Sequence, residues 1–495
     1  MDGPAHRRRQ VTAVVGAGAA GTLVTLQLCE AAAAGEVPWE VRLIDPAPDT
    51  GRGTAYRTED PRHLLNVPAG GMSAYPDDPS HFVDWCARQA DGDGTAPAAA
   101  DFLPRAWFGA YLDDALGEAV GRATARLGDS VRVSRVRARV VDLRWSPDPA
   151  GPALLLLDDG SRLRADGVVL ATGPDRAPNT GLPEGLRESA RFLPDPWAPG
   201  ALRPLLTGSG PGAVLLLGTG LTAVDVAIRA DRPGRVLHAV SRNGRLPRPH
   251  APAPLPPLAP PELLARPTPG QPLAALRASL ARHVRRAARL HGDWRPAVDG
   301  LRPVTSRLWQ ALSDPDRAEF LRRDSSLWNV HRHRMPPETA RTVDRLRQAG
   351  RLRVSTGRPV DCREDGDGLT VTLDDGRELS VAWVVDCRGP GLAAVPGADP
   401  LRDALLATGR AVPGPLGIGL RTDGGRLLGA DGSAALPFWT LGAVRRGELW
   451  ESTAIPEIRV QAAEIARRLL AERSAGNDEG AGTEQQGGER VLLGR

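Results

Sequence analysis

The stretch from Val11 to Leu28, VTAVVGAGAAGTLVTLQL, constrains the fold more strongly than any other part of the chain. A short apolar run meets Gly16, Gly18 and Gly21, and an apolar, helix-like pattern then begins. In a strand–turn–helix unit the first glycine permits a tight turn, the second lets a pyrophosphate approach the backbone, and the third lets helix and strand pack closely. The phosphates then meet free N–H groups at the helix N-terminus. The stretch therefore predicts a dinucleotide-binding unit.

Residues further along the same unit strengthen this prediction. Val41 to Ile44 indicates a second strand, and Asp45 comes directly after it, 29 residues after Gly16. An acid at this place accepts hydrogen bonds from the hydroxyls of a ribose. A chance glycine loop is the alternative, but it has no reason to combine a strand, a helix and an acid at this distance.

A second motif of the same kind lies at Ala213 to Ala227, AVLLLGTGLTAVDVA. A strand-like run enters a glycine turn at Gly218 and Gly220, and Ala223 takes the third small position. Val236 to Val240 indicates the second strand of this unit. The chain therefore has two predicted dinucleotide sites.

The two motifs differ at the end of their second strands. Ser241 and Arg242 stand where the first motif has Asp45. An arginine at this place accommodates a 2′-phosphate, which favours NADPH over NADH. Because arginine is abundant in this chain, surface decoration is the alternative interpretation of Arg242.

A long glycine-rich segment, Thr50 to Tyr75, comes after the first motif. Long loops beside a nucleotide motif are usually functional. Asn66 and Ser73 are placed to reach a cofactor ring. A packed surface loop is the alternative for each of them. Apolar anchors within the segment are Leu64, Leu65, Val67 and Met72.

Three strand-like runs come later in this half of the chain: Val131–Leu143, Ala153–Leu157 and Ser161–Leu170. Asp158, Asp159 and Gly160 form a hairpin signal between the last two. The third run ends at Thr172 and Gly173, small residues that suit a backbone close to a ligand. A similar hairpin and strand recur at Asp374 to Pro390. We expect both of these excursions, each a hairpin followed by a strand, to return to the sheet of the first nucleotide-binding domain.

The middle of the chain carries a connector and a helical insertion. Pro247 to Pro272 contains eleven prolines and is expected to be extended, because proline breaks helices and inner strands. Helical patterns come next, and we then expect the run from His331 to Arg334 on a loop. There it would bind a carboxylate or phosphate through charge-assisted hydrogen bonds. An N-terminal helix flank, an internal salt-bridge cluster and a role at the NADPH phosphates are the alternatives. Glu451 is expected to pair with an arginine, and orientation of the substrate is its alternative role.

Composition excludes several classes of protein. The 63 basic residues, all arginine, are interspersed with 59 acidic ones, so the net charge of +4 is poor evidence for nucleic-acid binding. The four cysteines have no paired spacing, which disfavours a disulfide scaffold, a metal site and a flavin-linked disulfide reductase. No run of eighteen apolar residues occurs, so we expect no membrane span and a cytoplasmic protein.

These stretches resemble the two-dinucleotide-domain flavoproteins, which include flavin-containing monooxygenases and ornithine or lysine N-hydroxylases. More closely, the chain resembles a bacterial family of FAD/NAD(P)-binding proteins, whose members include an aspartate N-monooxygenase that makes nitrosuccinate. The matching stretches are VVGAGAAGTL, GTAYRTEDPRHLLNVPAGGMSA, VVLATGP, LLLGTGLTAVDVA, SRNGRLPRPH, WNVHRHRMPP and GELWESTAIPEIRVQA.

The resemblance implies an α/β fold with two Rossmann-like dinucleotide-binding domains and a helical insertion. For FAD it implies Gly16, Gly18, Ala19, Ala20, Gly21, Asp45, Asn66, Val67, Met72, Ser73, Thr172, Gly173 and Gly442. For NADPH it implies Gly218, Gly220, Thr222, Ser241 and Arg242. One departure concerns the FxGxxxH fingerprint of flavin-containing and Baeyer–Villiger monooxygenases, which is replaced here by Phe192 to Trp197. That departure weakens the transfer of their oxygenation mechanism but not the FAD assignment.

The expected function is that of an FAD- and NADPH-dependent monooxygenase. NADPH would reduce the flavin, molecular oxygen would add as a hydroperoxide, and a small amine- or amino-acid-like metabolite would be hydroxylated. The substrate-side candidates are Asn66, His331, Arg332, His333 and Arg334. A flavin dehydrogenase or oxidase without oxygen transfer is the first alternative, and a non-enzymatic flavin-bound redox sensor is the second.

The expected organisation returns to the first domain late in the chain. Its parts are the first part of the FAD-binding domain at 10–200, the first part of the NADPH-binding domain at 201–250, the proline-rich connector and helical insertion at 251–350, a strand-rich return segment at 351–390, the C-terminal part of the FAD-binding domain at 391–472, and a disordered tail at 473–495.

Overall fold

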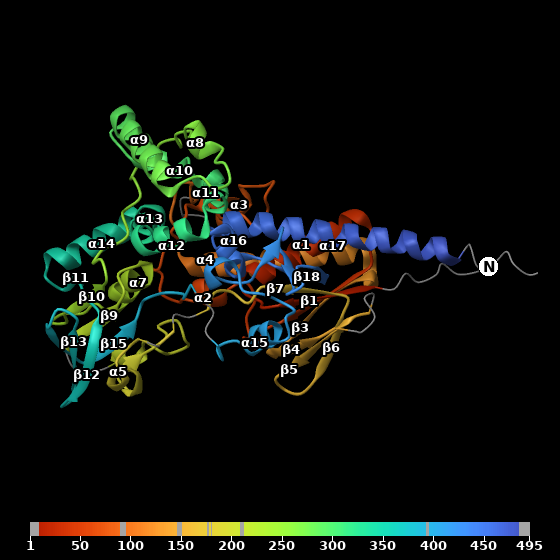
Figure 1. Ribbon diagram of the computed structural model, residues 1–495. Coiled ribbons are helices and arrows are strands. Elements are labelled where there is room, and N and C mark those ends of the chain that lie inside the picture. Colours follow the sequence, from red (N-terminus) through yellow and green to blue (C-terminus); the bar gives the residue numbers. More distant parts are fainter. Residues whose placement is uncertain are drawn as a thin grey trace, which may run out of the picture.

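Two parallel sheets and a group of helices organise the computed structural model of the chain (Figure 1). The structure describes residues 9–89, 96–145, 151–175, 178–179, 181–207, 212–392 and 396–484. Within these residues no helix combines the length and the apolar character that crossing a membrane requires.

The first sheet joins strands from both ends of the chain. Its order is β16-β17-β18-β7-β1-β2-β3. The five strands from β18 to β3 are parallel to one another, and β16 and β17 add an antiparallel edge. The late strand β18 therefore lies beside the early strand β7. The bounds are β1 Gln10–Val15, β2 Trp39–Ile44, β3 Val131–Val136, β7 Gly167–Leu170, β16 Thr422–Asp423, β17 Arg426–Leu428 and β18 Ala434–Thr440.

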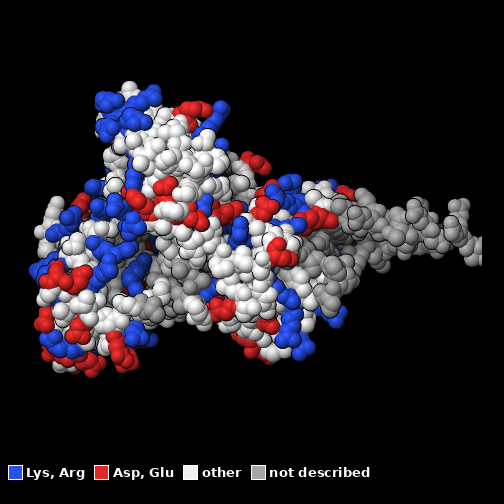
Figure 2. Space-filling model, in the orientation of Figure 1, with Lys and Arg blue, Asp and Glu red and all other residues white. Residues whose placement is uncertain are grey.

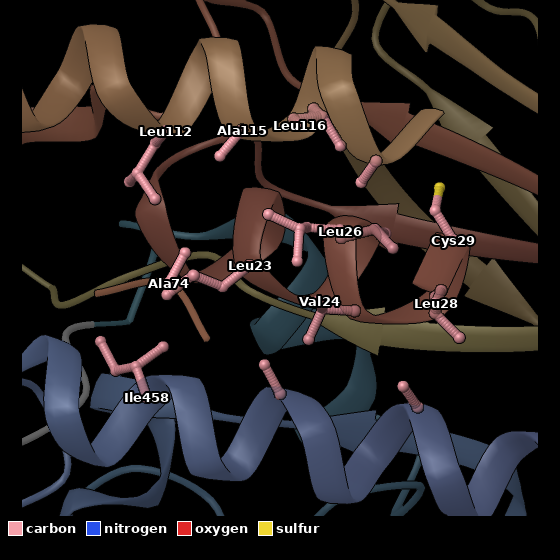
Figure 3. Close-up of a cluster of buried hydrophobic side chains, with 14 of the residues drawn as sticks. Leu23, Val24, Leu26, Leu28, Cys29, Ala74, Leu112, Ala115, Leu116 and Ile458 are labelled. Atoms are coloured by element: carbon pink, nitrogen blue, oxygen red, sulfur yellow. The ribbon is translucent and has the colours of Figure 1, made fainter. Parts of the chain in front are cut away.

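Helices cover one face of this sheet. The first helix, α1, is apolar all round because it lies between α4 and α17, with Leu23 and Leu26 fully buried. Figure 3 shows this layer, with Leu112 of α4 on one side of α1 and Ile458 of α17 on the other. The bounds are α1 Ala19–Gly35, α2 Gly53–Tyr56, α3 His81–Gln89, α4 Arg105–Leu127 and α17 Ile455–Glu484.

The opposite face is covered by a small antiparallel sheet and one helix. Ala13, Val15, Val168 and Leu170 point from the first sheet into this second core, which the small sheet and α15 complete. The bounds are β4 Val140–Arg144, β5 Ala153–Leu157, β6 Arg162–Ala165 and α15 Pro400–Ala407.

The second sheet repeats this plan. Its parallel strands run in the order β11-β10-β9-β15-β8. Helices α7 and α14 cover one face, and an antiparallel sheet of β12, β13 and β14 covers the other with α5. The bounds are α5 Glu184–Glu188, β8 Phe192–Leu193, α6 Arg203–Thr207, β9 Val214–Leu217, α7 Leu221–Ala230, β10 Leu237–Ser241, α14 Pro337–Gln348, β11 Leu352–Thr356, β12 Pro359–Asp365, β13 Gly368–Leu373, β14 Glu378–Val381 and β15 Trp383–Asp386.

Two of the stretches predicted as single strands are each divided into two strands in the structure. Val131–Leu143 is divided into β3 in the first sheet and β4 in the small sheet, and Ser161–Leu170 is divided likewise into β6 and β7. An apolar alternation persists when a chain passes from one sheet to the next, so the pattern hides the break. The hairpin predicted at Asp158 to Gly160 is confirmed by the antiparallel pairing of β5 with β6.

The prediction for the two excursions is correct for the first and wrong for the second. The first returns to the first sheet as β7, beside β1. The second does not, because β15 lies between β9 and β8 in the second sheet. Each parallel sheet therefore has its own antiparallel excursion, which ends in a strand beside the strand of its glycine motif.

The helical insertion lies between β10 and β11 and stands above the second sheet in Figure 1. The helix predicted from Leu273 is confirmed as α9. The proline-rich connector is extended except for α8, which starts after Pro261, where a proline is compatible with a helix start. The bounds are α8 Glu262–Ala265, α9 Leu273–His291, α10 Arg295–Asp299, α11 Thr305–Ala311, α12 Asp314–Arg323 and α13 Ser325–Arg332.

The last helix extends further than predicted. The segment after β18 forms a turn, η5 Gly442–Arg445, and a short helix, α16 Arg446–Leu449. The helix expected near Pro456 is confirmed as α17, and it continues to Glu484. Residues 474–484 of the stretch expected to be disordered are therefore helical, and residues 485–495 lie outside the described residues.

Candidate functional site

The first glycine turn has no room for side chains at two of its three glycines. Gly16 has φ +105°, and a Cβ on it would lie 2.4 Å from the carbonyl oxygen of Ala171 after β7. A Cβ on Gly21 would lie 1.8 Å from the carbonyl oxygen of Gly16. These contacts bring the start of α1 against the turn, as a dinucleotide-binding unit requires.

Gly18 occupies a different position, at the N-cap of α1 with Ala19 and Ala20 in the first turn. A Cβ on Gly18 would meet only the backbone of Gly53, at 3.4 Å. The segment before Gly53 is held over the turn, because the N–H of Gly51 donates to the carbonyl of Ala17 at 3.0 Å. The helix N-terminus therefore presents backbone N–H groups at a turn that admits a phosphate.

Asp45 comes directly after β2, as predicted. Its Oδ2 accepts the N–H of Ala17 at 2.7 Å, and its Oδ1 accepts the N–H of Ala47 at 2.8 Å. Each carboxylate oxygen has further lone pairs, so these bonds orient the group and leave capacity for ribose hydroxyls.

The other predicted flavin contacts lie at the ends of neighbouring strands. Thr172 and Gly173 come after β7 and are not buried; a Cβ on Gly173 would meet open space. Gly442 comes after β18 with φ +71°, and a Cβ there would lie 4.0 Å from the Cβ of Ala20. The carboxyl ends of β1, β2, β7 and β18 thus place these residues along one edge of the first sheet, where ligands of open α/β sheets bind.

The four predicted flavin contacts of the 66–73 loop differ in their exposure. Met72 and Ser73 are buried, and the Ser73 hydroxyl donates to the carbonyls of Asp78 at 2.5 Å and Tyr75 at 3.2 Å. Asn66 and Val67 are partly exposed and are the members of the predicted set that are open to a ligand.

The second glycine turn lines a cavity of about 660 Å³. Gly218 has φ +118°, and a Cβ there would lie 2.5 Å from the carbonyl oxygen of Cys387, which comes after β15. The structure brings the whole predicted NADPH set to this one cavity: Gly218, Gly220, Thr222, Ser241 and Arg242. Their binding of NADPH stays a prediction, but their convergence agrees with it.

Ser241 and Arg242 have different roles in this cavity. The Ser241 hydroxyl accepts the N–H of Gly244 at 3.1 Å and lies 2.9 Å from the Thr219 hydroxyl. Ser241 therefore shapes the turn after β10. Arg242 is exposed and forms no ion pair with any described residue, so its guanidinium is available to an anion.

Sequence reasoning missed several residues of the cavity. Arg245 and Arg358 line it beside Arg242, and neither forms an ion pair within the described part of the chain. Arg245 lies in the SRNGRLPRPH stretch, so its position was a usable signal. Arg358, which lies between β11 and β12, had none, because only the parallel pairing of β10 with β11 brings it near.

The loop predicted at His331 to Arg334 is wrong for its first two residues and correct for its last two. His331 and Arg332 end α13, and His333 is its C-cap. Arg332 Nε donates to Glu451 Oε2 at 2.9 Å, and Arg334 is buried and paired with Asp299. The alternative interpretation, an internal salt-bridge cluster, therefore describes Arg332 and Arg334 better, and the prediction that Glu451 pairs with an arginine is confirmed.

The two histidines of this run have different surroundings. His331 Nδ1 lies 2.8 Å from the carbonyl oxygen of Leu327, and the residue is not part of the cavity lining. His333 does line the cavity, and burial, aided by the charges of Arg332 and Arg446, lowers its pKa to about 3. His333 is therefore a neutral group at physiological pH.

Arg446, the first residue of α16, is a further cation in the cavity lining. Its guanidinium lies 5.0 Å from the centre of the Trp450 ring and has no hydrogen bond or ion pair among the described residues. Burial lowers its pKa, and the charge of Glu451 opposes that effect.

The lining of the cavity also includes Asn329, whose Oδ1 atom is buried without a hydrogen-bond partner among the described residues. Figure 2 shows basic side chains gathered over α14 and the second sheet, below the helical insertion.

Other chemistries find little support in the described residues. No group of three or more His, Cys, Asp or Glu side chains there is arranged to hold a metal ion. Cys29, Cys86, Cys362 and Cys387 are free and buried, and burial raises the pKa of Cys387 well above its usual value. None of these thiols is a ready nucleophile.

Two parallel sheets, each with a glycine turn after a central strand, define the class: this is the fold of flavoproteins with two dinucleotide-binding domains. Residues 13–175 match a protein-family model described as FAD-NAD(P)-binding. A comparison with curated protein sequences finds no match.

Solved structures share the fold over nearly the whole chain. L-lysine 6-monooxygenase from Pseudomonas syringae is 17% identical, with a TM-score of 0.59, and the match covers 94% of this chain and 99% of that one. Ornithine hydroxylase from Pseudomonas aeruginosa is 14% identical, with a TM-score of 0.55 and the same coverage. The FAD-bound cadaverine monooxygenase from Erwinia amylovora is 13% identical, with a TM-score of 0.54 and 94% of both chains covered. At these identities the likeness establishes the fold.

Proposed function

We propose that the protein is an FAD- and NADPH-dependent monooxygenase that hydroxylates a small amine- or amino-acid-like metabolite. One observation carries the proposal. The cavity at the Gly218 turn extends to Arg446, which is only four residues after Gly442, a predicted flavin contact. The cavity that holds the predicted NADPH set thus reaches the segment just after a predicted flavin contact, which supports neighbouring sites of the kind that hydride transfer requires.

The family match and the fold support this proposal. The match to the FAD-NAD(P)-binding model covers the first glycine turn, Asp45 and Gly173. The structures with the same fold include a lysine, an ornithine and a cadaverine monooxygenase, the last bound to FAD. The substrates of these three are amines, which is why we favour an amine-bearing metabolite.

A bound FAD would accept a hydride from NADPH and, once reduced, activate molecular oxygen. For an amine the balanced reaction is RNH₂ + O₂ + NADPH + H⁺ → RNHOH + NADP⁺ + H₂O. The chain needs no nucleophile of its own for this chemistry. It must instead bind the cofactors and substrate, orient them and exclude water.

The residues divide these tasks among them. Gly16 and Gly218 would let the pyrophosphates of the two cofactors approach the backbone, and Asp45 would accept hydrogen bonds from the ribose in the adenosine half of FAD. Arg242, with its neighbouring cavity cations, binds the 2′-phosphate. Arg446 binds an anionic group of the substrate, since it is partly buried, cationic and without an ion pair among the described residues.

The test begins without oxygen. The purified, FAD-loaded protein is mixed with NADPH under anaerobic conditions, and bleaching of the flavin absorbance is followed. Air and candidate amino acids, aspartate first, are then added, and hydroxylated product, peroxide and NADPH consumption are measured together. The proposal expects bleaching, and expects one substrate to convert NADPH consumption from peroxide release to product.

Arg446→Gln sharpens this test. Loss of one charge-assisted contact of about 2 kcal/mol should raise the substrate KM about 30-fold while flavin bleaching by NADPH is retained. Arg282→Gln, an exposed position on α9 outside the cavity lining, is the matched control and should change nothing. Absence of bleaching in the unaltered protein would refute the proposal. Bleaching with stoichiometric peroxide for every amine tested would favour an oxidase without oxygen transfer.

A further inference from the structure

A buried ion pair connects the two halves of the proposed active site. Asp225 lies on α7, the helix that begins at the second glycine turn, and is 4% exposed. Arg105, the first residue of α4, places Nη2 2.8 Å from Asp225 Oδ2, and the two side chains are 13% and 5% exposed. The Oδ2 atom accepts no well-aligned hydrogen bond from the described residues, so the contact is a close ion pair. Figure 1 shows α7 beside the part of the first unit that carries α2 and α4.

The same guanidinium also holds the flavin-side loop. Arg105 Nε donates to the carbonyl of Leu64 at 3.0 Å, and the backbone N–H of Arg105 donates to the carbonyl of His63 at 2.9 Å. Leu64 is two residues before Asn66, which is a predicted flavin contact. One arginine therefore ties the loop of the first unit to the nicotinamide-side helix of the second.

His63 completes the connection. It is fully buried, its Nε2 lies 3.1 Å from the carbonyl oxygen of Asp225, and its Nδ1 lies 2.7 Å from the Thr58 hydroxyl. Its ring meets the edge of Trp197 with 5.7 Å between ring centres. Arg62, the preceding residue, donates to the carbonyl of Ile228 on α7 at 3.1 Å. The contact is thus a network of side chains and backbone, not one isolated pair.

A buried ion pair is a weak source of stability. Replacing such a pair by apolar side chains of similar volume is often neutral or stabilising, because both charges lose water. Burial indeed raises the pKa of Asp225, against the opposing charges of Arg105 and His63. Unlike an apolar contact, the ion pair is a directional link that is fixed at both ends. It joins two units that each have their own core.

We propose that Arg105 and Asp225 are positioning residues that set the distance between the nicotinamide site on α7 and the flavin site beside the 63–66 loop. The inference rests on the proposed function. Neither side chain lines the cavity, so neither touches the reacting atoms. Hydride transfer depends steeply on the distance between donor and acceptor, and a displacement of about 1 Å can reduce the rate about 100-fold.

Asp225→Asn in the FAD-loaded enzyme is the direct test, with anaerobic stopped-flow measurement of flavin reduction. The expected result is a fall of about 30-fold in the limiting reduction rate, with the NADPH concentration at half-saturation changed less than about threefold. Asp225→Glu, which retains the charge, should recover part of the rate. The control is Asp344→Asn on α14, because Asp344 pairs with Arg347 of the same helix inside the second unit.

A measurement that does not depend on turnover accompanies the kinetics. In Asp225→Asn, backbone amides of His63 to Leu65 should exchange hydrogen faster, while Asp344→Asn should leave them unchanged. The double variant Arg105→Gln/Asp225→Asn removes both buried charges and guards against misfolding of the single variant. Its reduction rate should be no lower than that of Asp225→Asn, since the two residues act as one unit.

Three outcomes would overturn the inference. One is a rise in half-saturating NADPH with an unchanged limiting rate, which would make the pair part of nucleotide binding. Another is independent, multiplicative losses from the two single substitutions. The third is an Asp225→Asn enzyme whose reduction rate and amide exchange equal those of the unaltered enzyme. If the unaltered enzyme itself is not reduced by NADPH, the proposed function fails first, so the two failures are distinguishable.

Discussion

The two glycine turns share a backbone solution but differ in their surroundings. Gly16 and Gly218 have nearly the same φ, and each is closed off by a carbonyl from the strand that ends its own antiparallel excursion. The third small position differs, being Gly21 in one and Ala223 in the other. The residue after the second strand differs more, because an acid comes after β2 whereas β10 ends in Ser241 and leads to Arg242. The shared part fits any dinucleotide, and the differing part selects which one.

The largest expected effect comes from the third small position. Gly21→Ala would place a Cβ 1.8 Å from the Gly16 carbonyl oxygen, so helix and turn must separate. We expect a loss of about 3 kcal/mol in the free energy of unfolding together with loss of bound flavin. The reverse change in the second turn, Ala223→Gly, should cost only about 1 kcal/mol. Denaturant unfolding and flavin content after purification check both; equal effects in the two turns would contradict the difference between them.

The next effect concerns the charge after the second strand of the second turn. Arg242→Ala removes a cation placed for the 2′-phosphate, worth about 2 kcal/mol, so the KM for NADPH should rise about 30-fold. The KM for NADH should change less than about twofold, because NADH has no such phosphate. Steady-state kinetics with both nucleotides measure this, with Arg282→Ala as the control. If both constants rise together, Arg242 does not recognise the 2′-phosphate.

The smallest effect concerns the acid of the first turn. Asp45→Asn keeps the shape of the side chain but weakens its charge-assisted bonds, so the Kd for FAD should rise about fivefold, equivalent to about 1 kcal/mol. The KM for NADPH should stay the same. Fluorescence titration of FAD into the apoprotein measures the first quantity. A larger change in NADPH than in FAD binding would reverse the assignment of the two sites.

Much of the fold can be predicted from local sequence patterns. The strand, turn and helix around Gly16 and around Gly218 were predictable because each glycine answers a local steric demand. The hairpin at Asp158 to Gly160 was predictable for the same reason. Which sheet β15 would enter was not, because both excursions end in an apolar strand that leads to Gly-Pro, and only long-range pairing separates them.

The candidate site was predictable to the extent that its residues belong to motifs. Ser241 and Arg242 converge with the Gly218 turn in one cavity because they end the adjacent strand. The roles of Arg332 and Arg334 could not be predicted from the sequence. A run of cations has the same pattern whether its partner is a substrate or, as here, the distant acids Glu451 and Asp299. The place of Arg446 in the cavity lining was likewise not predictable, because it depends on where α16 lies relative to the second sheet.

The position of β18 beside β7 has a consequence for how the protein is made. The first sheet can take up β18 only after the ribosome has synthesised the chain as far as Thr440. Helix α1 is covered on its second side only after α17 has been synthesised. At about 5–20 residues per second, roughly tens of seconds separate the appearance of β7 from that of β18 on the ribosome. During that interval the apolar helix α1 has no partner on its α17 side. We therefore expect the protein to take up FAD only after α17 has been synthesised, because β18 and α17 complete the first sheet and its helical layer.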